Sequence, residues 1–197
     1  MKDDLEQLLE NLHLGRIKEV LAAEVARARK GQATYEDFLA RLLREQYHHR
    51  QEKALATRIR QARIPEKWSL ESFPFKRQPG VNPRQLKEFA ELDFIPKAEN
   101  IVFIGPTGVG KTGLATGILL KALQNGYRGL FIRAQDLFEE MFSSLADRST
   151  RKLLDHYARF PIILIDELGY LVTRPEQSNV FFKLMEERYR RFPTIIT

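Results

Sequence analysis

Apolar residues recur at helical spacing over the first third of the chain. Leucines between positions 5 and 12 repeat every three or four residues, and apolar residues between 17 and 25 do so again, which predicts two short helices. A third helix is predicted from Thr34, whose hydroxyl can cap the backbone together with Asp37. Pro65 ends that helix, because proline cannot continue it.

Between Ile64 and Pro96 the pattern loosens, and prolines interrupt it repeatedly. We expect a linker here with one short helix, over about Pro83 to Leu92. The linker also contains the apolar group Phe73, Pro74 and Phe75, which favours either an adenine pocket or core packing. Trp68 is interpreted as hydrophobic filler rather than as an anchor for the linker.

After Asn100 short apolar runs alternate with amphipathic stretches, which is typical of a mostly parallel sheet covered by helices. The predicted strands are Ile101–Ile104, Gly129–Arg133, Ile162–Ile165 and Thr194–Thr197. The predicted helices are Lys111–Gln124, Gln135–Leu145, Thr150–Arg159 and Pro175–Arg191. The pattern therefore predicts a helical N-terminal domain over 1–64, a linker over 65–99 and an α/β domain over 100–197.

Composition narrows the class of protein. The chain has 197 residues, of which 43% are hydrophobic, so it can bury one full core and a smaller helical appendage. It has no cysteine, which excludes disulfides and thiolate metal sites and fits a reducing compartment. An acidic start and the lack of a membrane-length apolar run favour a soluble, cytoplasmic protein without a membrane partner.

A formal net charge of +6 favours a polyanionic partner such as nucleic acid. The densest positive stretch lies on the second half of the third predicted helix and comprises Arg41, Arg44, Arg50, Lys53, Arg58, Arg60 and Arg63. These side chains either contact DNA phosphates or form a solvated helix face. The α/β domain adds further basic side chains, of which we expect most to face water and some to extend a DNA track. They are Arg128, Lys152, Lys183, Arg188, Arg190 and Arg191.

One segment matches the full phosphate-loop pattern G-x-x-x-x-G-K-[ST], between a predicted strand and a predicted helix. Its glycines let backbone N–H groups converge on phosphates at the helix N-terminus. Lys111 is expected to contact the β and γ phosphates of ATP, and the Thr112 hydroxyl to bind Mg²⁺. The segment comprises Gly105, Pro106, Thr107, Gly108, Val109, Gly110, Lys111 and Thr112.

A second motif follows the third predicted strand. Asp166 and Glu167 stand at its carboxyl end, where open α/β sheets bind their ligands. We expect Asp166 to hold Mg²⁺ directly or through water, and Glu167 to polarise the water that attacks the γ-phosphate. Kinases of small metabolites and GTPases generally place their catalytic or guanine-reading groups elsewhere, and the sequence has no Asn-Lys-x-Asp signal for guanine. The glutamate next to Asp166 therefore favours ATP hydrolysis over phosphoryl transfer.

Together these segments resemble IstB, the family of insertion-sequence ATP-binding proteins. The resemblance covers essentially the whole chain and is carried by Tyr35–Leu43, Pro65–Phe73, the phosphate loop and Ile165–Leu171. It implies an AAA+ domain of the ASCE type, related to that of DnaC-type helicase loaders. It also implies a helper of an insertion-sequence transposase that assembles as a homo-oligomer on double-stranded DNA, and it raises the DNA role of the basic helix.

Family members continue past the strand that ends at Thr197, so the resemblance implies a C-terminally truncated core. The polar sensor residue, the fifth strand and the arginine finger of AAA+ proteins are expected to lie in that further part. Two alternatives stay open: a replicative helicase loader, and an ATP-binding adaptor that does not hydrolyse ATP.

Overall fold

The computed structural model describes residues 2–31, 33–73, 78, 80–171 and 173–197. The chain forms two compact units, Met1–Ala56 and Thr57–Thr197. In the part of the chain that the structure describes, no helix has both the length and the apolar character that crossing a membrane requires.

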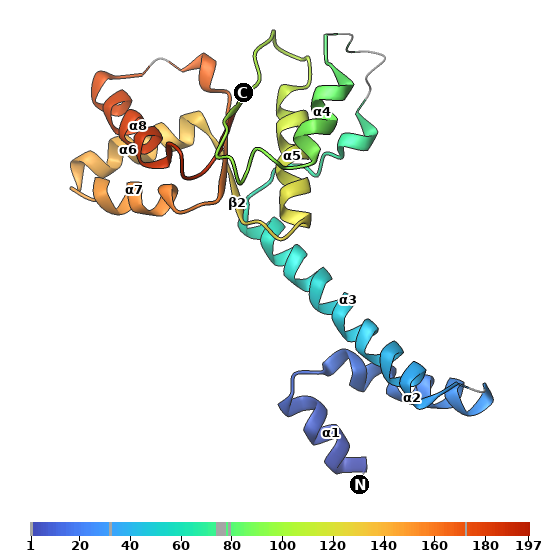
Figure 1. The fold of residues 1–197 in the computed structure, drawn as a ribbon. Coiled ribbons are helices and arrows are strands. Elements are labelled where there is room, and N and C mark those ends of the chain that lie inside the picture. The colour runs from blue at the N-terminus through green and yellow to red at the C-terminus, as the bar shows by residue number, and fades with distance from the viewer. Residues whose placement is uncertain (1, 32, 74–77, 79, 172) are drawn as a thin grey trace. The chain divides into compact units, whose positions relative to one another are not determined.

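The second unit is built on a parallel sheet of four strands in the order β1-β4-β3-β2 (Figure 1). Asp166 at the end of β3 stands beside Arg133 at the end of β2, so both side chains emerge at the carboxyl edge. The strands are β1 (Ile101–Val102), β2 (Gly129–Arg133), β3 (Ile162–Asp166) and β4 (Thr194–Ile196).

Strand β3 is buried on both faces, which explains its unbroken apolar run. Ile162 and Leu164 pack on one face with α4 (Pro83–Ala90) and α5 (Lys111–Gln124). Ile163 and Ile165 pack on the other face, under three further helices. Figure 1 shows the resulting helix–sheet–helix layers, whose second helical layer consists of α6 (Ala134–Ala146), α7 (Thr150–Ala158) and α8 (Pro175–Arg188).

Most predicted elements are confirmed, and β2 and α5 have the predicted bounds. The predicted first strand is too long, because β1 ends at Val102. Within the described part of the chain this strand pairs with β4 alone, and Val102 and Ile104 are 55% and 92% exposed, so little burial extends it. Helix α8 stops before the predicted end at Arg191, and Arg190 has a positive φ of 58°.

Arg188 is an exception to the expectation that most basic side chains of the α/β domain face water. Its side chain is only 1% exposed and lies between α7, α8 and β4. The guanidinium donates to the carbonyl oxygens of Tyr157 (3.1 Å), Phe160 (2.8 Å) and Pro193 (2.5 Å), and Nε donates to Thr194 Oγ1 (3.1 Å). Burial lowers the pKa of Arg188 to about 10. Arg188 therefore joins parts of the second unit and is inaccessible to a neighbouring molecule.

The first unit contains α1 (Lys2–Asn11), α2 (Gly15–Lys30) and the larger part of α3 (Tyr35–Gln61), whose last turn belongs to the second unit. The predicted cap of α3 is present, because the Asp37 N–H donates to Thr34 Oγ1 at 3.1 Å. The core of the first unit is small. Leu9, Ile17 and Leu42 are its buried members.

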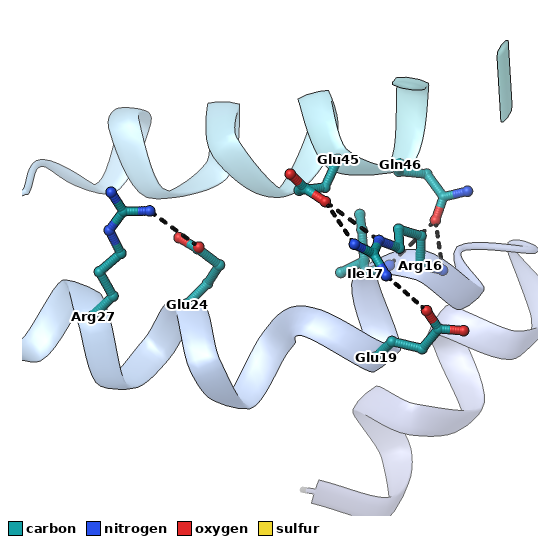
Figure 2. A network of polar contacts seen from close by, with 7 residues as sticks. All are labelled: Arg16, Ile17, Glu19, Glu24, Arg27, Glu45 and Gln46. Atoms are coloured by element: carbon teal, nitrogen blue, oxygen red, sulfur yellow. Dashed lines mark hydrogen bonds and ion pairs between the residues drawn. The ribbon is translucent and has the colours of Figure 1, made fainter. Parts of the chain in front are cut away.

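A polar network joins α2 to α3 in this unit (Figure 2). The buried side chain of Gln46 accepts hydrogen bonds from the backbone N–H groups of Arg16 (3.0 Å) and Ile17 (3.3 Å). Because Leu14 supplies no side-chain cap to α2, the amide oxygen of Gln46 satisfies the helix start from outside. Arg16 also pairs with Glu45 and Glu19, each at 3.1 Å.

Candidate nucleotide site

The glycine-rich segment lies between β1 and α5, as its pattern predicts. Gly110 precedes α5 with a φ of 87°, and a Cβ placed there would lie 2.9 Å from the Phe73 ring. Glycine is thus required at this position by both backbone conformation and space. No side chain caps α5, so its first N–H groups remain available to an anion.

Lys111 begins α5, and its ammonium lies against the loop from which the helix emerges. Nζ donates to the carbonyl oxygens of Gly105 (2.8 Å) and Pro106 (2.9 Å). These contacts hold the positive charge beside the phosphate loop, where the β and γ phosphates of a nucleotide would lie.

Asp166 is only 5% exposed, and two hydroxyl groups donate to its carboxylate. Thr112 Oγ1 lies 2.9 Å from Asp166 Oδ1, and Thr197 Oγ1 donates to the same oxygen. This brings together the predicted metal ligands, Thr112 and Asp166, which are 54 residues apart in sequence. Hard oxygen donors of this kind fit Mg²⁺, which keeps several waters and needs few protein ligands.

Glu167 follows Asp166 and is exposed to the cavity in front of the loop. Its backbone has a φ of 61°, in the left-handed region that a non-glycine residue seldom adopts. The Glu167 N–H donates to Thr197 Oγ1 at 3.0 Å, and the N–H of Leu168 donates to the Thr197 carbonyl at 2.9 Å. The end of β4 therefore fixes the backbone that presents the Glu167 carboxylate.

A cavity of about 600 Å³ opens over these groups, which is large enough for a nucleotide. Thr107 to Thr112, Asp166 and Glu167 line it, whereas Gly105 and Pro106 do not. Arg133, Thr116 and Thr197 also line it, and these three were not predicted from the sequence. A signal for Arg133 and Thr197 existed, because both end predicted parallel strands and such ends share one edge of the sheet.

Two linker aromatics form a wall of this cavity. Trp68 is 43% exposed and lines the cavity, and its interpretation as filler stays a prediction. A Cβ on Gly113 would lie 3.3 Å from the Trp68 indole, which shows that a glycine in α5 admits the ring. Phe73 also lines the cavity and packs against the core. Pro74 and Phe75, the other members of the predicted apolar group, lie outside the described residues.

Thr116 lies one turn after Thr112 on α5 and is fully buried. Its hydroxyl has no hydrogen-bond partner among the described residues. A buried hydroxyl without a partner costs free energy, of the order of 1–3 kcal/mol. Thr116 adjoins the cavity, but its hydroxyl is closed to solvent.

Comparison with known proteins agrees with this geometry. The family model described as IstB-like ATP binding protein matches residues 7–197. The chain belongs to the IstB-like family. A relative from insertion sequence IS5376 of Geobacillus stearothermophilus, named for ATP binding, is 32% identical over all of this chain and 78% of its own length. An IS21 relative from Pseudomonas aeruginosa is 31% identical over 98% of this chain and 73% of its own length.

Solved structures show that this IstB-like chain has the AAA+ fold. AMPPCP-bound DnaA from Aquifex aeolicus superposes with a TM-score of 0.59 at 21% identity, over 68% of this chain and 43% of the DnaA chain. The DnaC helicase loader gives a TM-score of 0.55 at 21% identity, over 66% of this chain and 75% of the loader. The predicted fold class, a parallel P-loop sheet flanked by helices, is confirmed.

The basic residues predicted for DNA contact differ in what their side chains do. Arg41 pairs with Glu24 at 3.0 Å, Arg50 donates to the His13 carbonyl at 3.2 Å, and Arg58 donates to the Leu123 carbonyl at 2.9 Å. The remaining four make no side-chain hydrogen bond or ion pair with a described residue. They are Arg44, Lys53, Arg60 and Arg63.

Proposed function

We propose that this chain is a magnesium-dependent ATPase that assists the transposase of an insertion sequence on double-stranded DNA, as a homo-oligomer in the cytoplasm. The observation that carries the ATPase part is the contact of Thr112 Oγ1 with Asp166 Oδ1 at 2.9 Å, at the mouth of a phosphate loop. It joins the two motifs that ATP hydrolysis requires within one cavity.

Each group has a defined part in this proposal. The loop N–H groups and Lys111 bind the phosphates, while Thr112 and Asp166 hold Mg²⁺. The ion supplies charge neutralisation to the phosphates when it is bound. Glu167 takes a proton from the attacking water, and its exposure to the cavity leaves room for that water.

The adenine is proposed to lie against Trp68 and Phe73. Both aromatics line the same cavity as the loop, and flat rings favour stacking with a base.

The partners are proposed from family membership. The relatives are proteins of insertion sequences, which supports a role for this chain beside a transposase and its DNA substrate. The net charge of +6 supports binding to a polyanion such as DNA.

Nucleotide binding is tested by titrating a fluorescent ATP analogue in the presence of Mg²⁺. Lys111→Ala should lower the affinity at least tenfold, because one charge-assisted contact to phosphate is worth about 1.5–3 kcal/mol. Lys87→Ala on the exposed face of α4 is the matched control and should leave the affinity unchanged. An unchanged affinity in Lys111→Ala would remove the nucleotide site from this loop.

Hydrolysis is tested separately by measuring phosphate release with and without duplex DNA. Glu167→Gln should keep ATP affinity and lose turnover by about 10²–10⁴-fold, as expected when a general base is removed. ATP binding without any turnover in the wild-type protein would favour the adaptor alternative. Co-purification with a helicase instead of the transposase of the same element would favour the loader alternative.

A further inference from the structure

A second cavity, of about 380 Å³, lies in the second unit at the amino end of the sheet. Its walls come from the last turn of α3, the residues before and at the start of β2, and the end of α7. The segment after α3 is fixed there because the N–H of Phe131 donates to the carbonyl oxygen of Ala62 at 2.7 Å. Figure 1 shows the end of α3 meeting β2.

This cavity is separate from the nucleotide site. Gly129, the first residue of β2, lines it, whereas Arg133, the last residue of that strand, lines the nucleotide cavity. Five residues of a parallel strand place the two sites roughly 13 Å apart along the sheet. A ligand here would thus occupy the opposite edge of the sheet from ATP.

The lining is strongly basic. Four arginines and one histidine contribute to it, and no described residue of the lining has a carboxylate. Arg58 is held by its bond to the Leu123 carbonyl, which fixes its guanidinium in the wall. The basic residues of the lining are Arg58, Arg60, Arg63, Arg128 and His156.

Three of these arginines have no hydrogen-bonded or ion-paired partner within the described chain. The side chains of Arg60, Arg63 and Arg128 are exposed and make no such contact with a described residue, although Arg63 interacts electrostatically with Tyr157. Clustering cations without counter-charges costs electrostatic free energy, which an anionic ligand would offset. Arginine offers a planar fork of N–H groups that matches phosphate oxygens in two-point contacts.

We infer that this cavity binds backbone phosphates of duplex DNA, and the inference rests on the proposed function in DNA transposition. The arginines come from separate chain segments and are open to solvent, as suits a polymer that passes along the surface. Lys152 lies one turn before His156 on the exposed side of α7 and extends the basic surface beyond the cavity. Contacts of this kind position the protein on DNA without reading its sequence.

The basic residues predicted for DNA contact fall into two groups. Arg58, Arg60 and Arg63 contribute to the cavity, together with Arg128 from the segment before β2. Arg41 and Arg50 serve contacts within the first unit instead. The DNA contact is therefore defined by a cavity of the ATPase unit rather than by one helix.

The test measures binding of the full chain to a short labelled duplex of mixed sequence, with ATP analogue and Mg²⁺, over a series of salt concentrations. The variant Arg60→Gln/Arg128→Gln removes two cations from the cavity. The slope of log K against log salt should become shallower by about 0.9 for each phosphate that loses its cation. Lys87→Gln/Lys183→Gln removes the same charge from exposed positions elsewhere and should keep the wild-type slope.

The outcomes separate this inference from the proposed function. If the wild-type protein binds the duplex and both double variants keep its slope, the cavity is not the phosphate site, although DNA binding stands. Equal loss in both variants would assign the effect to net charge and also overturn the inference. A wild-type protein that binds no duplex would refute the proposed DNA function itself. Unchanged affinity for the ATP analogue shows that each variant is folded.

Discussion

In the unit of residues 57–197, two apolar layers enclose a sheet whose central strand is buried on both faces. Among the described residues of the unit 1–56, the buried apolar core consists of Leu9, Ile17 and Leu42, and polar contacts join the helices. Gln46 caps α2 from a neighbouring helix, and Arg16, Lys18 and Arg41 pair with glutamates.

This difference suits different tasks. A nucleotide site needs side chains held in fixed positions, which a large apolar core provides. Exposed ion pairs each contribute little to stability and are weakened by salt. The stability of the first unit therefore depends on many small contributions. We therefore expect the first unit to open locally at lower free energy than the sheet.

The largest expected effect comes from the core of the second unit. Leu164→Ala on β3 should lower the free energy of unfolding by about 2–5 kcal/mol, because close packing on both faces leaves a cavity. Leu42→Ala in the first unit should lower the free energy of unfolding by less than about 2 kcal/mol. Fewer buried side chains surround Leu42, so they can move in to fill the space that the substitution leaves. Urea unfolding of the two variants compares them, and equal costs would contradict the difference in packing.

Mg-ATP should stabilise the second unit alone. At a hundredfold excess over the dissociation constant, the ligand should raise the free energy of unfolding of this unit by about 2.7 kcal/mol. Hydrogen exchange followed by mass spectrometry should show slower exchange in β3 and α5 and no change in α1 and α2. Lys111→Ala is the control that should remove the protection, and equal protection of α1 would show that the units respond as one.

A smaller effect is expected from the cap of α2. Gln46→Ala leaves the N–H groups of Arg16 and Ile17 without their acceptor, which should cost roughly 1–2 kcal/mol. Gln46→Glu keeps an oxygen and places a negative charge near a helix start, so it should retain the stability. Amide exchange in α2 measures both variants. If the substitutions accelerated amide exchange more in α5 than in α2, Gln46 would act elsewhere.

The smallest effect concerns Lys18. Its hydrogen bond to Glu10 raises the pKa of the ammonium above the ordinary value of 10.5. The contribution of this pair to stability is therefore complete below pH 10.5 and is lost as pH rises through the higher folded pKa. In Lys18→Gln, amide protection of α1 should fall less steeply above pH 10.5 than in the wild-type protein. Parallel curves would exclude the pair as a source of pH dependence.

The sequence was sufficient for features that depend on adjacent residues. The phosphate loop is one continuous pattern, and β3 is an apolar run that ends in two carboxylates, so the residue order alone locates both. The layer architecture followed from the alternation of strands and helices. These features need no knowledge of distant contacts.

Features that depend on distant segments were missed. Arg188 ends an amphipathic helix and looks like a surface residue, yet carbonyl groups from two other segments enclose its guanidinium. Trp68 packs closely on Gly113, which stands 45 residues later in the sequence. Helical periodicity gives the face of a residue but not the partner that meets it.

The backbone of Glu167 bears on how this protein could evolve. A glutamate held at a φ of 61° costs roughly 1–3 kcal/mol, and its backbone N–H donates to Thr197 Oγ1 after β4. Asparagine tolerates this conformation better, so the residue that would make the chain most stable differs from the one that gives it a carboxylate beside the phosphates. Selection for stability and selection for turnover therefore oppose each other at this position.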